Sequence, residues 1–258
     1  MTLFLTSSPC IYKHAPATLN PANGFVDRLK AALPQNPRTL FVASSPDDHA
    51  MTDFYAGDMA GAFDRAGIPL PGWQLLDGKT ADRAGELVAW SDFIILMGGH
   101  VPTQNAFFNK NGLKELLSGY PGVIMGISAG TMNAADTVYA QPEADGESKP
   151  SFRRFYPGLG LTDINICPHY QEVIEKNMRV DGIPIYPDIT AADSMGHTFH
   201  IFPDGTYLFR DDQDHAIFGK CLRMRDGILE LLIEDGEHID LNCTKEPPIG
   251  RLSGCRER

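Results

Sequence analysis

Unbroken apolar runs, separated by segments of helical character, constrain the fold of this chain more than any other feature. Three such runs cover residues 39–43, 92–97 and 123–125. A strand that is apolar along its whole length is buried on both faces, which is typical of a parallel sheet covered by helices. Between the runs, residues 51–63 and 103–117 are predicted to be helical. The first half is therefore predicted to be an α/β fold with a doubly wound, mostly parallel sheet.

The C-terminal part has a different sequence pattern, typical of short antiparallel strands. From residue 197 onward, short strand-like runs are separated by Asp-Gly pairs at 204–205, 226–227 and 235–236, which are a strong hairpin signal. We therefore predict a C-terminal antiparallel β meander. No linker, repeat or low-complexity tract separates it from the rest, and 258 residues with 43% hydrophobic content can bury one full core. We expect a single domain over 1–258, with 197–258 as its β-rich extension.

Residues 121–133 hold the stretch that points to chemistry. A short apolar strand runs into Gly126-Ile127-Ser128-Ala129-Gly130 and leaves as a run of helix formers. This is the G-x-S-x-G nucleophile elbow, a sharp strand-to-helix turn that exposes a serine hydroxyl above the edge of the sheet. The pattern predicts that Ser128 is a nucleophile. A tight turn with a capping serine is the alternative explanation.

A serine nucleophile needs a base within hydrogen-bond reach and an acid that orients the base. Of the eight histidines, His169 is favoured because it follows a predicted strand, residues 161–167, whose end would lie at the same sheet edge as Ser128. His100, beside Gly98-Gly99, is the rival. His197 and His200 are expected on the face of a hairpin strand.

The acid and the oxyanion donors are predicted from two further loops. Asp193, in the small-residue segment 191–196, is the predicted acid, with turn capping as the alternative. Asp204 ranks below it because Pro-Asp-Gly-Thr is ordinary hairpin chemistry. The backbone amides of Gly99 and Ala129 are predicted to form the oxyanion hole, since one donor follows the nucleophile and the other comes from a neighbouring strand end.

Composition removes several other functions. A net charge of −11 without a Lys/Arg run argues against nucleic acid or an anionic membrane as partner. The five cysteines are odd in number and contain no C-x-x-C pair, so no disulfide framework, metal site or cofactor is expected. The first residues lack the features of a signal peptide, and no segment approaches the length of a membrane span. We expect a cytoplasmic protein.

Taken together, these motifs resemble peptidase family S51. This is the aspartyl dipeptidase or peptidase E group, with cyanophycinases as relatives, on a fold similar to class I glutamine amidotransferases. The resemblance extends to about residue 208, and its order of nucleophile, histidine and acid differs from that of α/β-hydrolases. It is carried by Gly98-Gly99-His100 with Gln104 and Phe107-Phe108, by residues 126–133, by Pro168-His169-Tyr170 and by Asp193-Ser194-Met195-Gly196.

The resemblance implies a role for each matching residue. Ser128 would be the nucleophile, His169 the base, Asp193 the acid, and Gly99 and Ala129 the oxyanion donors, without a metal. The dipeptidase has glutamate where Asp193 is placed here. Its specificity arginine has no assigned counterpart; the candidates are Arg153, Arg154, Arg179 and Arg210.

The implied activity is that of a serine peptidase, dipeptidase-like, which cleaves small peptides through an acyl-enzyme. Peptides with an acidic N-terminal residue are among the implied substrates. The alternative is a catalytically inactive or glutaminase-like member of the same fold that acts as a binding protein. The expected partner is a small peptide, and a homodimer is the one assembly considered.

Overall fold

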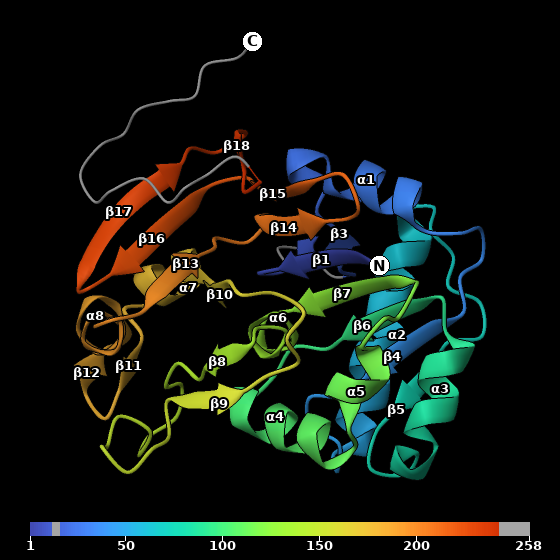
Figure 1. Ribbon diagram of the computed structural model, residues 1–258, viewed down its shortest axis with the longest axis horizontal. Helices are drawn as coiled ribbons and strands as arrows, with labels where there is room; N and C mark the ends of the chain where they lie inside the picture. Colours follow the sequence, from blue (N-terminus) through green and yellow to red (C-terminus); the bar gives the residue numbers. More distant parts are fainter. Residues whose placement is uncertain (12–15, 243–258) are drawn as a thin grey trace.

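A central eight-stranded sheet organises the computed structural model, which describes residues 1–11 and 16–242 (Figure 1). The strand order is β18-β15-β14-β1-β7-β6-β4-β5. The five strands β1, β7, β6, β4 and β5 pair in parallel, each with the next. This confirms the predicted mostly parallel sheet. The bounds of these strands are β1 Thr2–Thr6, β4 Thr39–Val42, β5 Gln74–Leu76, β6 Phe93–Leu96 and β7 Val123–Ile127.

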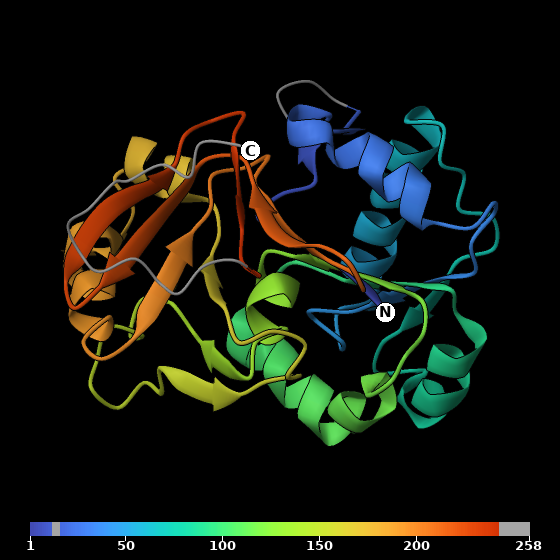
Figure 2. The same ribbon diagram turned by 45° about the horizontal axis from the view of Figure 1, so that its top comes forward.

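Helices cover both faces of this sheet (Figure 2). On one face, α1 (Phe25–Ala32) and α2 (His49–Arg65) pack against strand residues such as Phe41 and Met125. On the other face, α3 (Ala84–Trp90) and α4 (Val101–Lys110) pack with α5 (Leu113–Leu117). Every residue of β4, β6 and β7 is buried. Two covered faces are therefore the reason why these strands have no polar alternation.

One predicted helix is two helices in the structure. Residues 103–117 contain most of α4 and all of α5, separated at Gly112, which has a φ of 62°. This left-handed conformation suits glycine because it has no Cβ. The break turns the chain so that Phe108 and Leu113 are both buried in the same cluster.

The strands after residue 197 pair antiparallel with one another, but they divide between two sheets. Three of them extend the central sheet beyond β1: β14 (Tyr207–Arg210), β15 (His215–Phe218) and β18 (His238–Asp240). The second sheet has the order β10-β13-β16-β17, formed by β10 (Asn165–Cys167), β13 (Thr198–Ile201), β16 (Cys221–Arg225) and β17 (Ile228–Ile233). The chain therefore crosses repeatedly between sheets. The last part of the predicted extension, residues 243–258, lies outside the described residues.

Short elements complete the fold. The second sheet packs against α7 (Tyr170–Glu175), α8 (Thr190–Asp193) and the helical turn η3 (Ile185–Ile189). Helix α6 (Ala129–Asn133) follows β7. The remaining pieces are β2 (Cys10–Ile11), β3 (Thr18–Leu19), η1 (Ala22–Gly24), η2 (Ala81–Arg83), β8 (Thr137–Tyr139), β9 (Phe155–Pro157), β11 (Arg179–Val180) and β12 (Ile183–Pro184).

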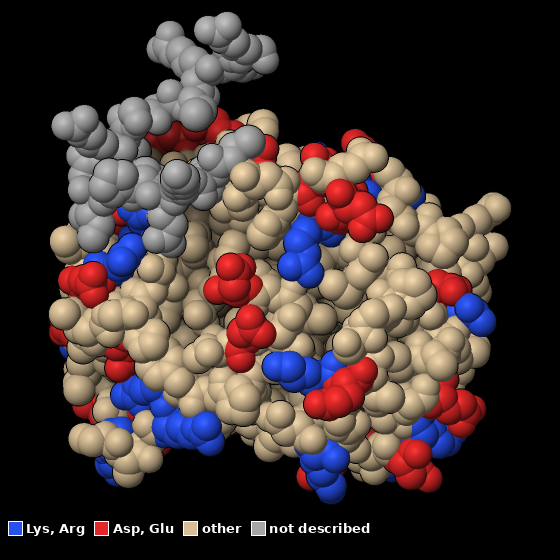
Figure 3. Space-filling view, in the orientation of Figure 1, with Lys and Arg blue, Asp and Glu red and all other residues tan. Residues whose placement is uncertain are grey.

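The surface and the cysteines carry few special features. On the face drawn in Figure 3, basic and acidic residues are interspersed. Within the described residues, no helix is both long enough and apolar enough to pass through a membrane. Cys10, Cys167 and Cys221 are buried free thiols, whereas Cys243 and Cys255 lie outside the described residues. Burial raises the pKa of the Cys167 thiol to about 12, so this thiol is inert as a nucleophile at neutral pH.

Candidate active site

Ser128 occupies a strained turn between β7 and α6. Its φ of 49° and ψ of −109° are seldom adopted by a residue with a side chain. Ser128 is partly exposed, while the residues on either side, 123–127 and 129–135, are buried. Glycine is needed at position 130 because a Cβ there would overlap the carbonyl oxygen of Leu96 at the end of β6. The turn therefore presents one hydroxyl at the carboxyl edge of the sheet.

The end of β1 holds this turn in place. The carbonyl oxygen of Thr6 accepts a hydrogen bond from the Ser128 amide (3.2 Å) and another from the Thr131 hydroxyl (2.8 Å). The Thr6 hydroxyl in turn donates to the carbonyl of Gly126 (2.8 Å). Residues on both sides of Ser128 are thus bonded to one residue of the neighbouring strand.

The next residue of β1's end, Ser7, anchors His169. The Ser7 hydroxyl accepts a hydrogen bond from the His169 amide (2.8 Å) and donates one to Asp204 Oδ1 (2.7 Å). His169 Nδ1 lies 2.9 Å from the same carboxylate oxygen. Because Thr6 holds Ser128 and Ser7 holds His169, the serine and the imidazole lie at the same edge of the central sheet. Ser7 was not identified from the sequence, since its role depends on which strand lies beside β7.

Asp204 is the carboxylate that pairs with His169. It lies in the connection from β13 to β14 and is half-buried. Burial is the largest single influence on the pKa of this carboxyl, and it raises the pKa. The hydrogen bond and charge of His169, together with the Ser7 hydroxyl, lower the pKa, and their combined effect is larger than that of burial. The net result is a pKa below the ordinary value for aspartate, so Asp204 is ionised at neutral pH.

Asp193 has different partners, which corrects the expected pairing. It is the last residue of α8, and its Oδ2 accepts hydrogen bonds from the Tyr139 hydroxyl (2.9 Å) and from Arg154 Nε (2.8 Å). The carboxylate is therefore neutralised within the layer that packs on the second sheet. The predicted pair of His169 with Asp193 is not the pair that the structure forms; His169 pairs with Asp204.

The loop after β6 borders Ser128. A Cβ atom at Gly98 would lie 3.3 Å from the Cβ of Ser128. Gly99 has a φ of 155°, and a Cβ there would overlap the hydroxyl of Ser44 at the end of β4. Glycine is therefore required at position 99 and leaves room for Ser128 at position 98, where three strand ends converge. The predicted oxyanion donors, Gly99 and Ala129, belong to the two backbone segments that meet at the serine.

The other histidines considered from the sequence, His100, His197 and His200, have surroundings that differ from those of His169. His100 Nδ1 bonds to the Thr103 hydroxyl (2.7 Å), and its Nε2 bonds to Glu147 (2.9 Å). Both ring nitrogens of this rival base are thus engaged. His197 stacks on Phe155 with ring centroids 4.2 Å apart. Burial lowers the pKa of His200 to about 4, so its ring is neutral at neutral pH.

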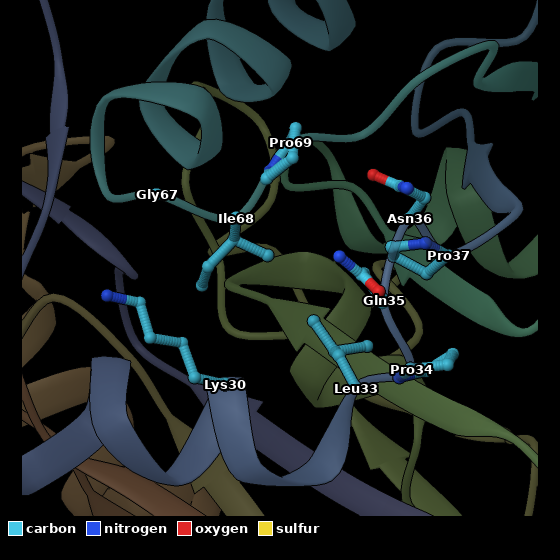
Figure 4. A pocket seen from close by; sticks show the side chains of 9 residues that line it. All are labelled: Lys30, Leu33, Pro34, Gln35, Asn36, Pro37, Gly67, Ile68 and Pro69. Carbon is cyan, nitrogen blue, oxygen red and sulfur yellow. The ribbon is translucent and has the colours of Figure 1, made fainter.

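No cluster of metal-ligating side chains marks this edge among the described residues. In residues 1–11 and 16–242, no group of three or more His, Cys, Asp or Glu side chains is arranged to hold a metal ion. A hollow of about 360 Å³ lies instead at the opposite edge, lined by the loops that precede β4 and follow α2 (Figure 4). Lys30 is its one ionisable lining residue, so this hollow has no group suited to hydrolysis.

Comparisons with known proteins agree on the family and on the fold. Residues 3–217 match the model of peptidase family S51. No curated protein matches the chain. Among solved structures, a peptidase from an acI-B1 Actinobacterium is similar, with a TM-score of 0.65 and 17% identity over 93% of this chain and 96% of that one. A putative peptidase E protein from Listeria monocytogenes EGD-e has a TM-score of 0.52 and 19% identity, over 90% and 98%.

Proposed function

The chain belongs to peptidase family S51 and is a peptidase, and we propose that it cleaves small peptides by serine chemistry through an acyl-enzyme. The observation that carries this proposal is the shared anchoring at the end of β1. Adjacent residues there hold the Ser128 amide and the His169–Asp204 pair. A nucleophile, a base and an acid within one bonded framework are the components of such a reaction.

Each group has a separate task in the proposed mechanism. Ser128 Oγ attacks the carbonyl carbon of the scissile bond, and His169 Nε2 takes the hydroxyl proton and passes it to the departing amine. A water molecule, activated by the same imidazole, then hydrolyses the ester. Asp204, bonded to Nδ1, fixes the tautomer and stabilises the imidazolium. The Gly99 and Ala129 amides stabilise the oxyanion, each donor contributing about 3 kcal/mol in the transition state.

The charges near the site support neutral or basic substrates. The loops at 98–101, 128–131, 141–148 and 167–171 contain the acidic residues Glu143, Asp145 and Glu147 and no Lys or Arg, although Lys149 follows the third loop. Arg154 donates to the carbonyl oxygens of Glu147 and Ser148 in that loop, and its charge is paired with Asp193. The arginines considered from the sequence are engaged or distant: Arg153 bonds to Phe155 O, Arg154 to Asp193, Arg179 to Gly182 O, and Arg210 pairs with Leu3 at the far end of β1. We therefore propose dipeptides with a neutral or basic first residue, in preference to aspartyl dipeptides.

A fluorophosphonate probe tests the serine chemistry directly. The folded protein should be labelled once, at Ser128, and Ser128→Ala should abolish the labelling. Ser45→Ala is the matched control, because Ser45 is a partly exposed serine beyond the end of β4, which is separated from β7 by β6, and this variant should be labelled like the wild type. If the probe does not label the folded wild-type protein, the serine mechanism is wrong, and the inactive, binding alternative is favoured.

The substrate is tested by amine release from dipeptides with acidic, neutral and basic first residues. The expected result is that aspartyl and glutamyl dipeptides are the poorest of the series. A clear preference for acidic first residues would contradict the proposed specificity, while leaving the serine mechanism intact.

A further inference from the structure

Gln104, in α4, fixes the loop that carries one of the two predicted oxyanion donors. Its side chain is fully buried, and its Nε2 donates a hydrogen bond of 2.7 Å to the carbonyl oxygen of Met97. Met97 directly precedes Gly98 and Gly99. The amide of Gln104 therefore restrains the backbone immediately before the glycine turn.

Asn133 fixes the segment that carries the other donor. It is the last residue of α6, whose first residue is Ala129, and it is fully buried. Its Nδ2 donates to Gln104 Oε1 (3.0 Å) and to the carbonyl oxygen of Val101 (3.2 Å). The two buried amides thus form one bonded link from the glycine turn to the elbow helix.

A third amide completes the link. Asn105, also buried, donates from Nδ2 to Asn133 Oδ1 (2.9 Å) and to the carbonyl oxygen of Pro157 (3.0 Å). Burying polar groups without partners is costly, whereas a fully bonded network is rigid because each member restrains the next. Apolar side chains could fill this space but would not fix the distance between the two backbone segments.

We propose that Gln104 and Asn133 are positioning residues that set the spacing of the Gly99 and Ala129 amides. This inference rests on the proposed serine mechanism. Oxyanion donors are effective only when they are aimed at the position that the charged oxygen will occupy. A displacement of about 1 Å at a catalytic group can cost on the order of 100-fold in rate. The pair is therefore expected to affect the transition state more than substrate binding.

The test replaces Gln104 with methionine, which has a similar length and no hydrogen-bonding amide. We expect Gln104→Met to lower kcat by about 10- to 100-fold with little change in KM. Binding of a peptide aldehyde, whose adduct with Ser128 places an oxygen in the oxyanion hole, should weaken by a similar factor. Asn111→Ala is the control, because its side chain bonds to Phe107 O on the same helix and has no bond to the glycine turn.

A conservative variant separates positioning from folding. In Gln104→Glu, burial favours the protonated acid, which can still donate to Met97 O and accept from Asn133. This variant should retain much of the wild-type kcat at low pH and lose it as the pH rises and the acid ionises. If Gln104→Met does not fold, this pH profile still provides the measurement.

The outcomes separate this inference from the proposed function. A labelled wild type together with an unchanged kcat in Gln104→Met, or with a change in KM alone, would overturn the positioning role. So would a Gln104→Glu profile that follows the wild type through the pH range in which carboxyl infrared absorption shows that the acid ionises. A wild type that no fluorophosphonate labels would defeat the serine mechanism itself.

Discussion

Two histidine–aspartate pairs lie at the carboxyl edge of the central sheet. Only one of them is bonded to the end of β1, which also holds Ser128. His49 Nδ1 is 2.7 Å from Asp77 Oδ2, and His169 Nδ1 is 2.9 Å from Asp204 Oδ1. The imidazoles are similarly exposed, at 29% and 31%. The distance between the partners and the exposure of the imidazole therefore do not distinguish the two pairs.

The partners of the two carboxylates make the difference. Asp77 is bonded to its own sequence neighbours, the amide of Lys79 and the hydroxyl of Thr80, and is 7% exposed. Asp204 is bonded to Ser7, which is distant in sequence and adjacent to the residue that holds Ser128. An aspartate that closes a local turn is structural, whereas one bonded across strands can orient a base for a nucleophile on another strand.

The largest expected effect concerns the serine. Ser128→Ala should lower kcat/KM by about 10⁶-fold if the three groups act as a unit, because the acyl-enzyme can no longer form. Ser45→Ala, four residues before His49, should leave kcat/KM essentially unchanged. Steady-state kinetics on the preferred dipeptide measure both. Substantial residual activity in Ser128→Ala would show that the nucleophile is a different residue.

The two imidazoles should differ almost as much. His169→Ala removes the proposed base and should reduce kcat on the order of 10⁶-fold. His49→Ala removes an imidazole from a structural pair and should alter thermal stability with little change in kcat. Equal losses of kcat in the two variants would erase the distinction drawn between the pairs.

Replacing the two aspartates, Asp204 and Asp193, should lower kcat by less than replacing the histidine and should show which of them is the acid. Asp204→Asn should lower kcat by about 10⁴-fold, since the amide favours the wrong tautomer of the imidazole. Asp193→Asn disturbs the bonds to Arg154 and Tyr139 and should mainly reduce stability. If kcat falls more in Asp193→Asn than in Asp204→Asn, the acid suggested by the sequence would be restored.

The smallest effect is on stability and depends on pH. Burial raises the pKa of Asp77, but bonds from His49, Lys79 and Thr80 outweigh it, and the pKa lies below its ordinary value of 3.8. The resulting stabilisation is complete above pH 3.8 and is lost as the pH falls through the lower folded value. Asp77→Asn should therefore cost about 1–3 kcal/mol at neutral pH. Melting curves should show that the difference from wild type closes in acid.

The parallel strands and the elbow could be predicted because their signals are local. Burial on both faces removes polar residues from β4, β6 and β7, and the turn around Ser128 needs small residues within a few positions. These two features depend on neighbours in the sequence. His169 also follows a strand end, but that strand, β10, belongs to the second sheet, so the bond from its amide to Ser7, and not a shared sheet, brings it to the edge where Ser128 lies.

The acid and its anchor could not be predicted in the same way. Asp204 belongs to a Pro-Asp-Gly-Thr segment that looks like a hairpin turn, yet the flanking strands β13 and β14 belong to different sheets. Ser7 contributes only because β1 lies beside β7, and that pairing joins residues more than a hundred positions apart. Asp193 satisfied the expected pattern, but α8 directs its carboxylate to Arg154.

The junction between the two sheets passes through the proposed triad. His169 leaves the smaller sheet after β10, Asp204 leaves it after β13, and Ser128 rises from the larger one. A small separation of the two sheets at this junction would move the base away from the nucleophile while each sheet stayed folded. Activity should accordingly be lost on heating at a lower temperature than the one at which the protein unfolds.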